Sequence, residues 1–195
     1  MSYILILYYS RHGSVKQLAK YIAMGVESCN IEARIRTVPS ISPNTEQTEK
    51  EIPEEGAIYA SLDDLANCSG LALGSPSRFG NIAAPLKYFL DSTSKLWANG
   101  ALDGKPASTF TSSSSMHGGQ ETTQLSMYMP LLHHGMLMVG ISPKESGLYT
   151  TNQGGTPYGA SHVTGKDNDN SFSKEEKEIA INLGKRLATI TKKLS

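Results

Sequence analysis

A short polar turn near the start of the chain holds the first residues that could do chemistry. Ser10, Gly13 and Ser14 lie between an apolar run, Tyr3 to Tyr9, and a segment with apolar residues at every fourth position. A strand end followed by a helix start offers unpaired backbone N–H groups and the positive end of the helix dipole. Because the turn has neither a GxGxxG nor a GxxxxGKS/T pattern, amides and hydroxyls must bind the anion. The turn therefore suits a terminal phosphate, although Ser10 and Ser14 could merely cap the helix.

Two more polar loops follow apolar segments. In LALGSPSRFGN, Arg78 and nearby amides could bind the polar edge of a ring-shaped ligand and stabilise negative charge on it, while Phe79 could shield a face of the ring. Taken alone, Arg78 could be a solvated arginine and Phe79 a core aromatic. In FTSSSSMHGGQET, residues Ser112 to His117 can add hydrogen-bond donors, but a serine-rich loop by itself is a weak signal.

The elements that must position these loops alternate along the chain. Apolar runs predict strands at Tyr3 to Tyr9, Ile31 to Val38, Gly70 to Gly74, Ala107 to Thr111 and Gly135 to Val139. After the helix that follows the first turn, helices are predicted at Leu62 to Ala66, Ala84 to Leu90, Gln120 to Leu132 and about Ser173 to Leu194. Ser173 with Glu176 three residues later forms a candidate capping box for the last helix.

This alternation predicts an α/β fold: a flavodoxin-like, doubly wound, five-stranded parallel sheet in a three-layer α/β/α arrangement, with long loop insertions. The insertions are Pro39 to Gly56 and Ser142 to Asn170, and loops of such length are usually functional or disordered. Residues 1–195 are expected to form a single domain. In such a sheet the turns after the first and third strands meet where the strand order reverses, and a flavodoxin-type sheet binds the phosphate of FMN there.

Composition excludes several kinds of partner. With 18 basic and 18 acidic residues the formal charge is zero, which favours neither nucleic acid nor an acidic membrane surface. The first apolar run is too short to span a bilayer and no basic segment precedes it, so we expect a cytoplasmic protein. Cys29 and Cys68 lack a CxxC-type spacing, which argues against a disulfide framework and a zinc site.

Several motifs in order resemble one family across nearly the whole chain. YYSRHGS, GSPSRFGN, LWANGAL, SSMHGGQE, HHGM and GGTPYGA are similar to the WrbA family of flavodoxin-like NAD(P)H:quinone oxidoreductases. The resemblance implies non-covalently bound FMN and two-electron reduction of quinones by NADH or NADPH. It also implies a homotetramer, a dimer of dimers, in which neighbouring subunits complete the flavin sites.

The resemblance also implies roles for individual residues. The positions that match FMN-binding residues are Ser10, Arg11, His12, Gly13, Ser14, Val15, Ser77, Arg78, Phe79, Ser112, Ser113, Ser114, Ser115, Met116, His117 and His133. His133 matches the flavin-side histidine and would be the catalytic group, placed to hydrogen-bond flavin or quinone oxygen. Trp97 and His12 are implied as substrate-binding residues, but His12 stands where family members often have a tyrosine near the nicotinamide.

Other interpretations of these residues stay open. Trp97 could anchor a core or an interface, and His133 could be a structural histidine. A metal site is not expected, because no Glu or Cys near His133 and His134 completes a ligand set. The leading function is ping-pong transfer of two electrons from NAD(P)H through FMN to a quinone. The alternatives are a flavodoxin-type one-electron carrier and a flavin-binding or flavin-free interaction module.

Overall fold

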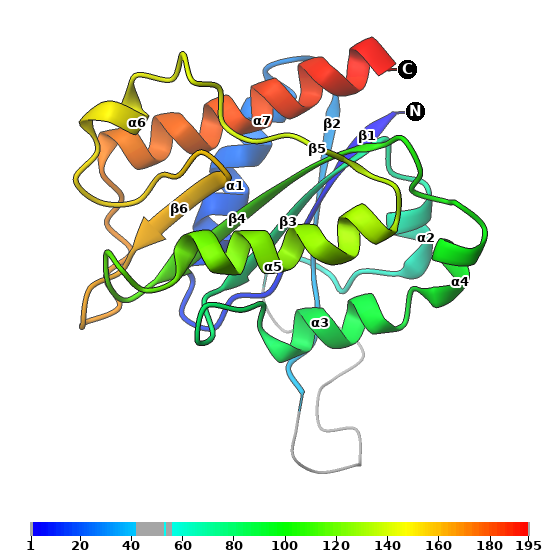
Figure 1. Cartoon of the computed structure of the whole chain (residues 1–195), viewed down its shortest axis with the longest axis horizontal. Helices are drawn as coiled ribbons and strands as arrows, with labels where there is room; N and C mark the ends of the chain where they lie inside the picture. The colour runs from blue at the N-terminus through cyan, green and yellow to red at the C-terminus, as the bar shows by residue number, and fades with distance from the viewer. Residues whose placement is uncertain (1, 42–52, 54–55, 195) are drawn as a thin grey trace.

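The computed structural model describes residues 2–41, 53 and 56–194, in which strands and helices alternate (Figure 1). The strands are β1 (Tyr3–Tyr8), β2 (Glu32–Thr37), β3 (Gly70–Pro76), β4 (Pro106–Ser113), β5 (Leu137–Met138) and β6 (Gly159–Val163). The helices are α1 (Ser14–Glu27), α2 (Leu62–Ala66), α3 (Ala84–Asp91), α4 (Ser94–Ala98), α5 (Gln120–His133), α6 (Gly147–Thr150) and α7 (Lys174–Leu194). Most of the long loop predicted at Pro39 to Gly56 lies outside the described residues.

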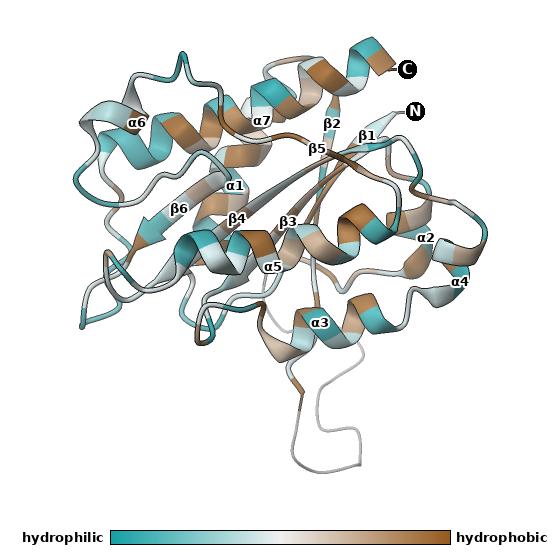
Figure 2. Ribbon diagram, viewed as in Figure 1, coloured by the Kyte–Doolittle hydropathy of each residue, from teal (hydrophilic) through white to brown (hydrophobic). Residues whose placement is uncertain are grey.

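The apolar run of β1 is buried on both faces because a helical layer covers each side of the sheet. On one face Ile4 and Ile6 pack with residues of α1 and α7. On the other face Leu5 and Leu7 pack with residues of α3 and α5. Figure 2 shows brown on the central strands β1 and β3 and paler colour on β4, whereas the covering helices carry both brown and teal, as amphipathic helices do. The predicted three-layer α/β/α arrangement is confirmed.

The strand order is β2-β1-β3-β4-β5, and each of these neighbouring pairs is parallel. The chain therefore runs outward from β1 to β2 and then crosses back to β3 on the other side of β1. Tyr8, the last residue of β1, pairs with Gly74 near the end of β3. The turns that follow these two strands consequently begin side by side, as the flavodoxin-like prediction requires.

The edge of the sheet differs from the prediction of five strands. The fifth strand contains only Leu137 and Met138, since Gly135 has a φ of 78° and still belongs to the turn that ends α5. A sixth strand, β6, lies within the segment that was predicted to be a loop, Ser142 to Asn170. Both β5 and β6 pair with β4, the first at its start and the second along its later residues. The edge position is thus shared by two short strands, and the excursion between them carries α6.

Two glycines allow α7 to pack closely on α1. A Cβ atom on Gly25 would lie 1.9 Å from the carbonyl oxygen of Ile181, and one on Gly184 would lie 2.1 Å from that of Ile22. At the start of α7 the predicted capping box is present: the Glu176 amide donates to Ser173 Oγ at 3.1 Å, and the Ser173 amide donates to Glu176 Oε2 at 2.9 Å. These contacts fix the first turn of α7 beside β6.

Candidate functional site

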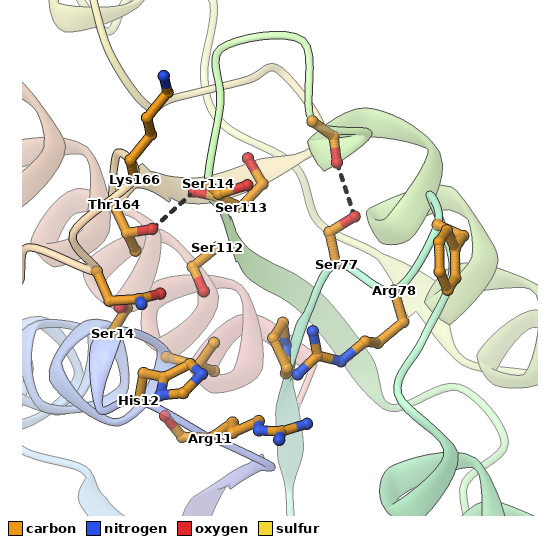
Figure 3. A pocket seen from close by; sticks show the side chains of 16 residues that line it. Arg11, His12, Ser14, Ser77, Arg78, Ser112, Ser113, Ser114, Thr164 and Lys166 are labelled. Carbon is orange, nitrogen blue, oxygen red and sulfur yellow. Dashed lines mark hydrogen bonds between the residues drawn. The ribbon is translucent and has the colours of Figure 1, made fainter.

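A cavity of about 570 Å³ opens at the carboxyl ends of β1, β3 and β4. Its size lies within the range of small-molecule sites. The residues that line it come from the turns after these strands and from the segment after β6 (Figure 3). They are Ser10, Arg11, His12, Ser14, Val15, Pro76, Ser77, Arg78, Phe79, Ser112, Ser113, Ser114, Gly118, Thr164, Lys166 and Asn168. All three loops singled out in the sequence therefore contribute to one cavity.

The first turn exposes the start of α1 to this cavity. Gly13 has a φ of 95°, a left-handed conformation that favours glycine, and precedes the first helical residue. The first intrahelical bond runs from the Gln17 amide to the Gly13 carbonyl at 2.9 Å, which leaves the amides of residues 14–16 without a helical acceptor. The Gly13 amide donates to Ser10 Oγ at 3.2 Å, so the Ser10 hydroxyl proton is available to an anion. No acidic residue occupies the first turn of α1.

The second and third loops are tied to each other. The Ser77 amide donates to the Ser112 carbonyl at 2.8 Å, and the Ser77 hydroxyl donates to the Gly118 carbonyl at 2.8 Å. In a tight turn the Arg78 amide donates to the Asn81 carbonyl at 3.0 Å, and Phe79 takes a φ of 54°. This left-handed conformation is uncommon for a bulky residue. The Phe79 ring is fully exposed at the rim of the cavity.

The third loop contributes only its first half to the cavity. Ser112, Ser113 and Ser114 line it, whereas Ser115, Met116 and His117 do not. The carbonyl of Ser115 accepts hydrogen bonds inside the loop, from Ser113 Oγ at 2.7 Å and from Gln120 Nε2 at 3.0 Å. The chain therefore leaves the cavity at residues 115–117 and returns to it at Gly118, just before α5.

The cavity is electrostatically suited to an anion. Among the described residues that line it, Arg11, Arg78 and Lys166 carry positive charge and none is Asp or Glu. Figure 3 shows the guanidinium groups of Arg11 and Arg78 on the same side of the cavity, below Ser77 and Ser112. Positive groups in a recess without acidic neighbours attract and hold negatively charged ligands.

Sequence reasoning missed one wall of the cavity. Thr164, Lys166 and Asn168 belong to the segment after β6, and the long loop was not divided into a strand and a binding segment. The signal that could have found this wall is the Asp- and Asn-rich run after the GGTPYGA motif, TGKDNDN at 164–170, which also contains Gly165 and Lys166. Such composition is typical of turns that present polar groups.

His133 and Trp97 do not line this cavity. His133 is exposed at the last residue of α5, and the first residues of the same helix adjoin the third loop. Trp97 lies on α4 with 58% of its surface exposed. Figure 1 shows α4 and the end of α5 at the opposite end of the molecule from the tip of β6. Within one chain, these two side chains and the cavity occupy different ends of the sheet.

His134, the residue after His133, has a structural role. His134 is buried, and its Nε2 lies 2.8 Å from Thr93 Oγ1. Burial, together with the neighbouring His133, holds the pKa of His134 below its usual range.

The described part of the chain contains no group of three or more His, Cys, Asp or Glu side chains arranged to hold a metal ion. Cys29 and Cys68 are both free thiols. None of the helices in the described ranges is both long and apolar enough to cross a membrane.

Residues 3–143 match the family described as NADPH-dependent FMN reductase. The solved structure of a flavodoxin, WrbA-like protein from Agrobacterium tumefaciens is 20% identical, with a TM-score of 0.71 over 100% of both chains. A flavodoxin from the domain Archaea is 18% identical, with a TM-score of 0.63 over 97% of this chain and 98% of that one. Flavodoxin 1 from Bacillus cereus is 14% identical, with a TM-score of 0.61 over 96% and 98% of the two chains. These structures share the fold.

Proposed function

This chain belongs to the NADPH-dependent FMN reductase family, and we propose that it transfers two electrons from NAD(P)H to quinones in a ping-pong reaction. As a member of that family it is a flavin oxidoreductase with FMN as cofactor and NAD(P)H as electron donor. The quinone acceptor and the likeness to WrbA proteins belong to the proposal. The observation that carries it is the cavity in which the turns after β1, β3 and β4 meet, where the described lining residues include positive and no acidic side chains.

The residues of the cavity fit FMN. The amides at the start of α1 and the hydroxyl of Ser10 would hold the phosphate, because they supply donors where a helix begins. Ser14 gives an amide there, while its hydroxyl donates to Asn170 Oδ1 at 2.6 Å. Arg78 and the loop around Ser77 would hold the ring, and Ser112 to Ser114 would supply donors between the two ends. The monoester phosphate needs no dinucleotide glycine pattern, and the turn has none.

Bound FMN supplies a centre that accepts a hydride from a nicotinamide and gives it to an acceptor, so this chain needs no covalent nucleophile. The chain's own residues would bind and orient the flavin and its substrates and neutralise negative charge on the ring. The Arg78 guanidinium would stabilise negative charge on the ring and fix its edge. Phe79, exposed at the rim, would cover an apolar surface of ring or substrate. His12, exposed beside Arg11 in the first turn, would contact the nicotinamide nucleotide.

We further propose a homotetramer in which neighbouring chains bring Trp97 and His133 to the cavity. In this proposal His133 hydrogen-bonds a flavin or quinone oxygen and Trp97 lies against the substrate. Support comes from exposed apolar side chains at helical spacing on α5: Leu125, Met129 and Leu132 are 41%, 53% and 49% exposed. Figure 2 shows brown segments on this exposed helix. An apolar stripe of this kind marks an interaction surface, and a second copy of the chain would cover it.

The test is steady-state oxidation of NADPH by benzoquinone with FMN-loaded protein, run beside light scattering over a dilution series. We expect quinone-dependent turnover, with mass and activity falling together on dilution. Rapid reduction of FMN without turnover on quinone would instead favour a one-electron carrier. A stable monomer with full activity would refute the shared site, and His133→Ala with unchanged turnover would remove that residue from the mechanism.

A further inference from the structure

The segment 164–170, which we call the strap, connects two of the three loops around the cavity. At its start, the Thr164 amide donates to the Ser113 carbonyl at 2.9 Å. At its end, Asn170 lies on the first turn: its Oδ1 accepts from Ser14 Oγ at 2.6 Å and its Nδ2 donates to the His12 carbonyl at 3.0 Å. The strap therefore closes the side of the cavity between the first turn and the third loop.

A buried ion pair lies beneath the strap. His162 on β6 and Glu176 on α7 both have fully buried side chains, and His162 Nδ1 lies 3.0 Å from Glu176 Oε1. His162 Nε2 lies 3.0 Å from the carbonyl oxygen of Asp169 in the strap. A carboxylate and a carbonyl oxygen only accept hydrogen bonds, so both ring nitrogens must donate and the imidazole is protonated. The Phe172 ring stacks on His162 with centroids 3.8 Å apart.

The carboxylate of Glu176 is fully hydrogen-bonded. Its Oε1 accepts from the amides of Gly154 at 3.0 Å and Val163 at 3.2 Å, and its Oε2 accepts from the Ser173 amide at 2.9 Å. Burial acts to raise the pKa of Glu176, but the bond from His162 and these amides outweigh it and lower that pKa. Burial acts to lower the pKa of His162, but Glu176 and the Asp169 carbonyl outweigh it and raise that pKa. Both shifts therefore favour the charged form of each partner.

We propose that the strap is a fourth binding loop for the phosphate-bearing part of FMN, and that the His162–Glu176 pair is its positioning element. The proposal rests on the proposed FMN site. Lys166, Thr164 and Asn168 line the cavity, and Lys166 is its third positive residue. The strap also carries Asp167 and Asp169, but neither is among the residues that line the cavity, and the Asp169 carboxylate accepts a hydrogen bond from the Ser171 amide at 2.8 Å. Asn170 holds the first turn in place from outside.

The binding loop is tested by FMN dissociation constants measured from flavin fluorescence. We expect Lys166→Ala to weaken FMN binding roughly tenfold, because it removes a charge-assisted contact with the phosphate. We expect Asn170→Ala to weaken FMN binding as well, because it removes the hydrogen bonds that hold the first turn. The matched controls, Asn152→Ala and Lys144→Ala, change exposed residues outside the cavity and should leave the constant unchanged. Unchanged binding in both strap variants would overturn the fourth binding loop.

The positioning pair is tested without FMN, by amide hydrogen exchange in the strap of the apo protein. Glu176→Gln and His162→Gln should each speed exchange of residues 164–170, while Glu178→Gln, on an exposed pair with Lys174, should not. If one variant fails to fold, the other decides. Unchanged exchange in a folded variant would overturn the positioning role, whereas wild-type protein that binds no FMN would refute the proposed function and the binding loop together.

A pH profile separates positioning from a merely structural role. The charged groups around His162 are Glu176 from α7 and Asp169 from the strap; Phe172 covers the ring, and Tyr21 of α1 packs edge-on against Phe172. Wild-type affinity for FMN should fall as the pH rises through the raised pKa of His162, because the neutral ring can donate only one of its two hydrogen bonds. His162→Gln should lack this step. A step of equal size in His162→Gln would contradict the proposal.

Discussion

The cavity has two kinds of wall. Three loops follow β1, β3 and β4 and lie within residues 3–143, the part that matches the reductase family. The strap lies beyond those residues and is held by β6 and α7, through an ion pair that joins residues 14 positions apart. The loops are positioned by local turns at strand ends, whereas the strap depends on a buried contact between elements. On the proposed function, the loops would carry the chemistry of the family and the strap would adjust the affinity for FMN in this chain.

The largest effect expected is on folding stability, from the buried pair. Glu176→Ala should lower the free energy of unfolding by about 3–5 kcal/mol, because it leaves a buried imidazolium and several amides without an acceptor. Glu178→Ala, which removes an exposed partner of Lys174, should cost less than about 1 kcal/mol. Denaturant unfolding of both variants measures the comparison. Equal losses would show that the pair beneath the strap contributes no more than a surface contact.

The second largest effect expected is on FMN affinity, from a change in the first turn. Gly13→Val should weaken FMN binding roughly tenfold or more, because a left-handed residue with a side chain costs about 1–2 kcal/mol and the branched chain would approach Asn170. Gly104→Val is the matched control: Gly104 also has a left-handed φ, 71°, but does not line the cavity. FMN titration of both variants should show a loss only for Gly13→Val. Equal affinity in the two variants would contradict the phosphate assignment.

A smaller effect is the pH dependence of stability. The raised pKa of His162 gives a contribution fully present below its ordinary value of 6.5 and lost as the pH rises through the folded pKa. The lowered pKa of Glu176 gives a contribution present above its ordinary value of 4.5 and lost as the pH falls through the folded pKa. The pair should therefore stabilise the folded state most between pH 4.5 and pH 6.5. Urea unfolding of the wild type and of His162→Gln at a series of pH values measures the difference between their free energies of unfolding. A difference that does not change with pH would contradict this account.

The smallest effect expected is on hydride entry. His12→Ala should slow flavin reduction by NAD(P)H several-fold, which is less than the tenfold change in rate that corresponds to about 1.4 kcal/mol in the activation barrier. FMN content and the rate of reoxidation by quinone should change little. Lys144→Ala, which changes an exposed residue outside the cavity, is the control. Stopped-flow measurement of each half-reaction separates the outcomes. Loss of FMN would assign His12 to the phosphate turn, and an unchanged rate of reduction would make it a bystander.

Much of the fold could be predicted because its signals are local. The fully apolar β1 indicated a strand covered on both sides, and Ser173 with Glu176 predicted the cap of α7. The second role of Glu176 could not be predicted, since it requires β6 beside α7 and β6 has a short, partly polar sequence. Similarly, the sequence predicts one binding loop from Ser112 to His117, but the turn at Ser115 takes residues 115–117 out of the cavity lining. The proposed roles of Trp97 and His133 would require contacts between chains, so they stay predictions.

The central claim is two-electron transfer from NAD(P)H through FMN to a quinone, and one anaerobic titration tests it most directly. FMN-loaded protein is bleached with one equivalent of NADPH and then titrated with benzoquinone while the flavin absorbance is followed. The account predicts complete bleaching, and complete recovery of the oxidised spectrum after a single equivalent of quinone. Failure of NADPH to bleach the flavin, or recovery only with a one-electron acceptor, would contradict it.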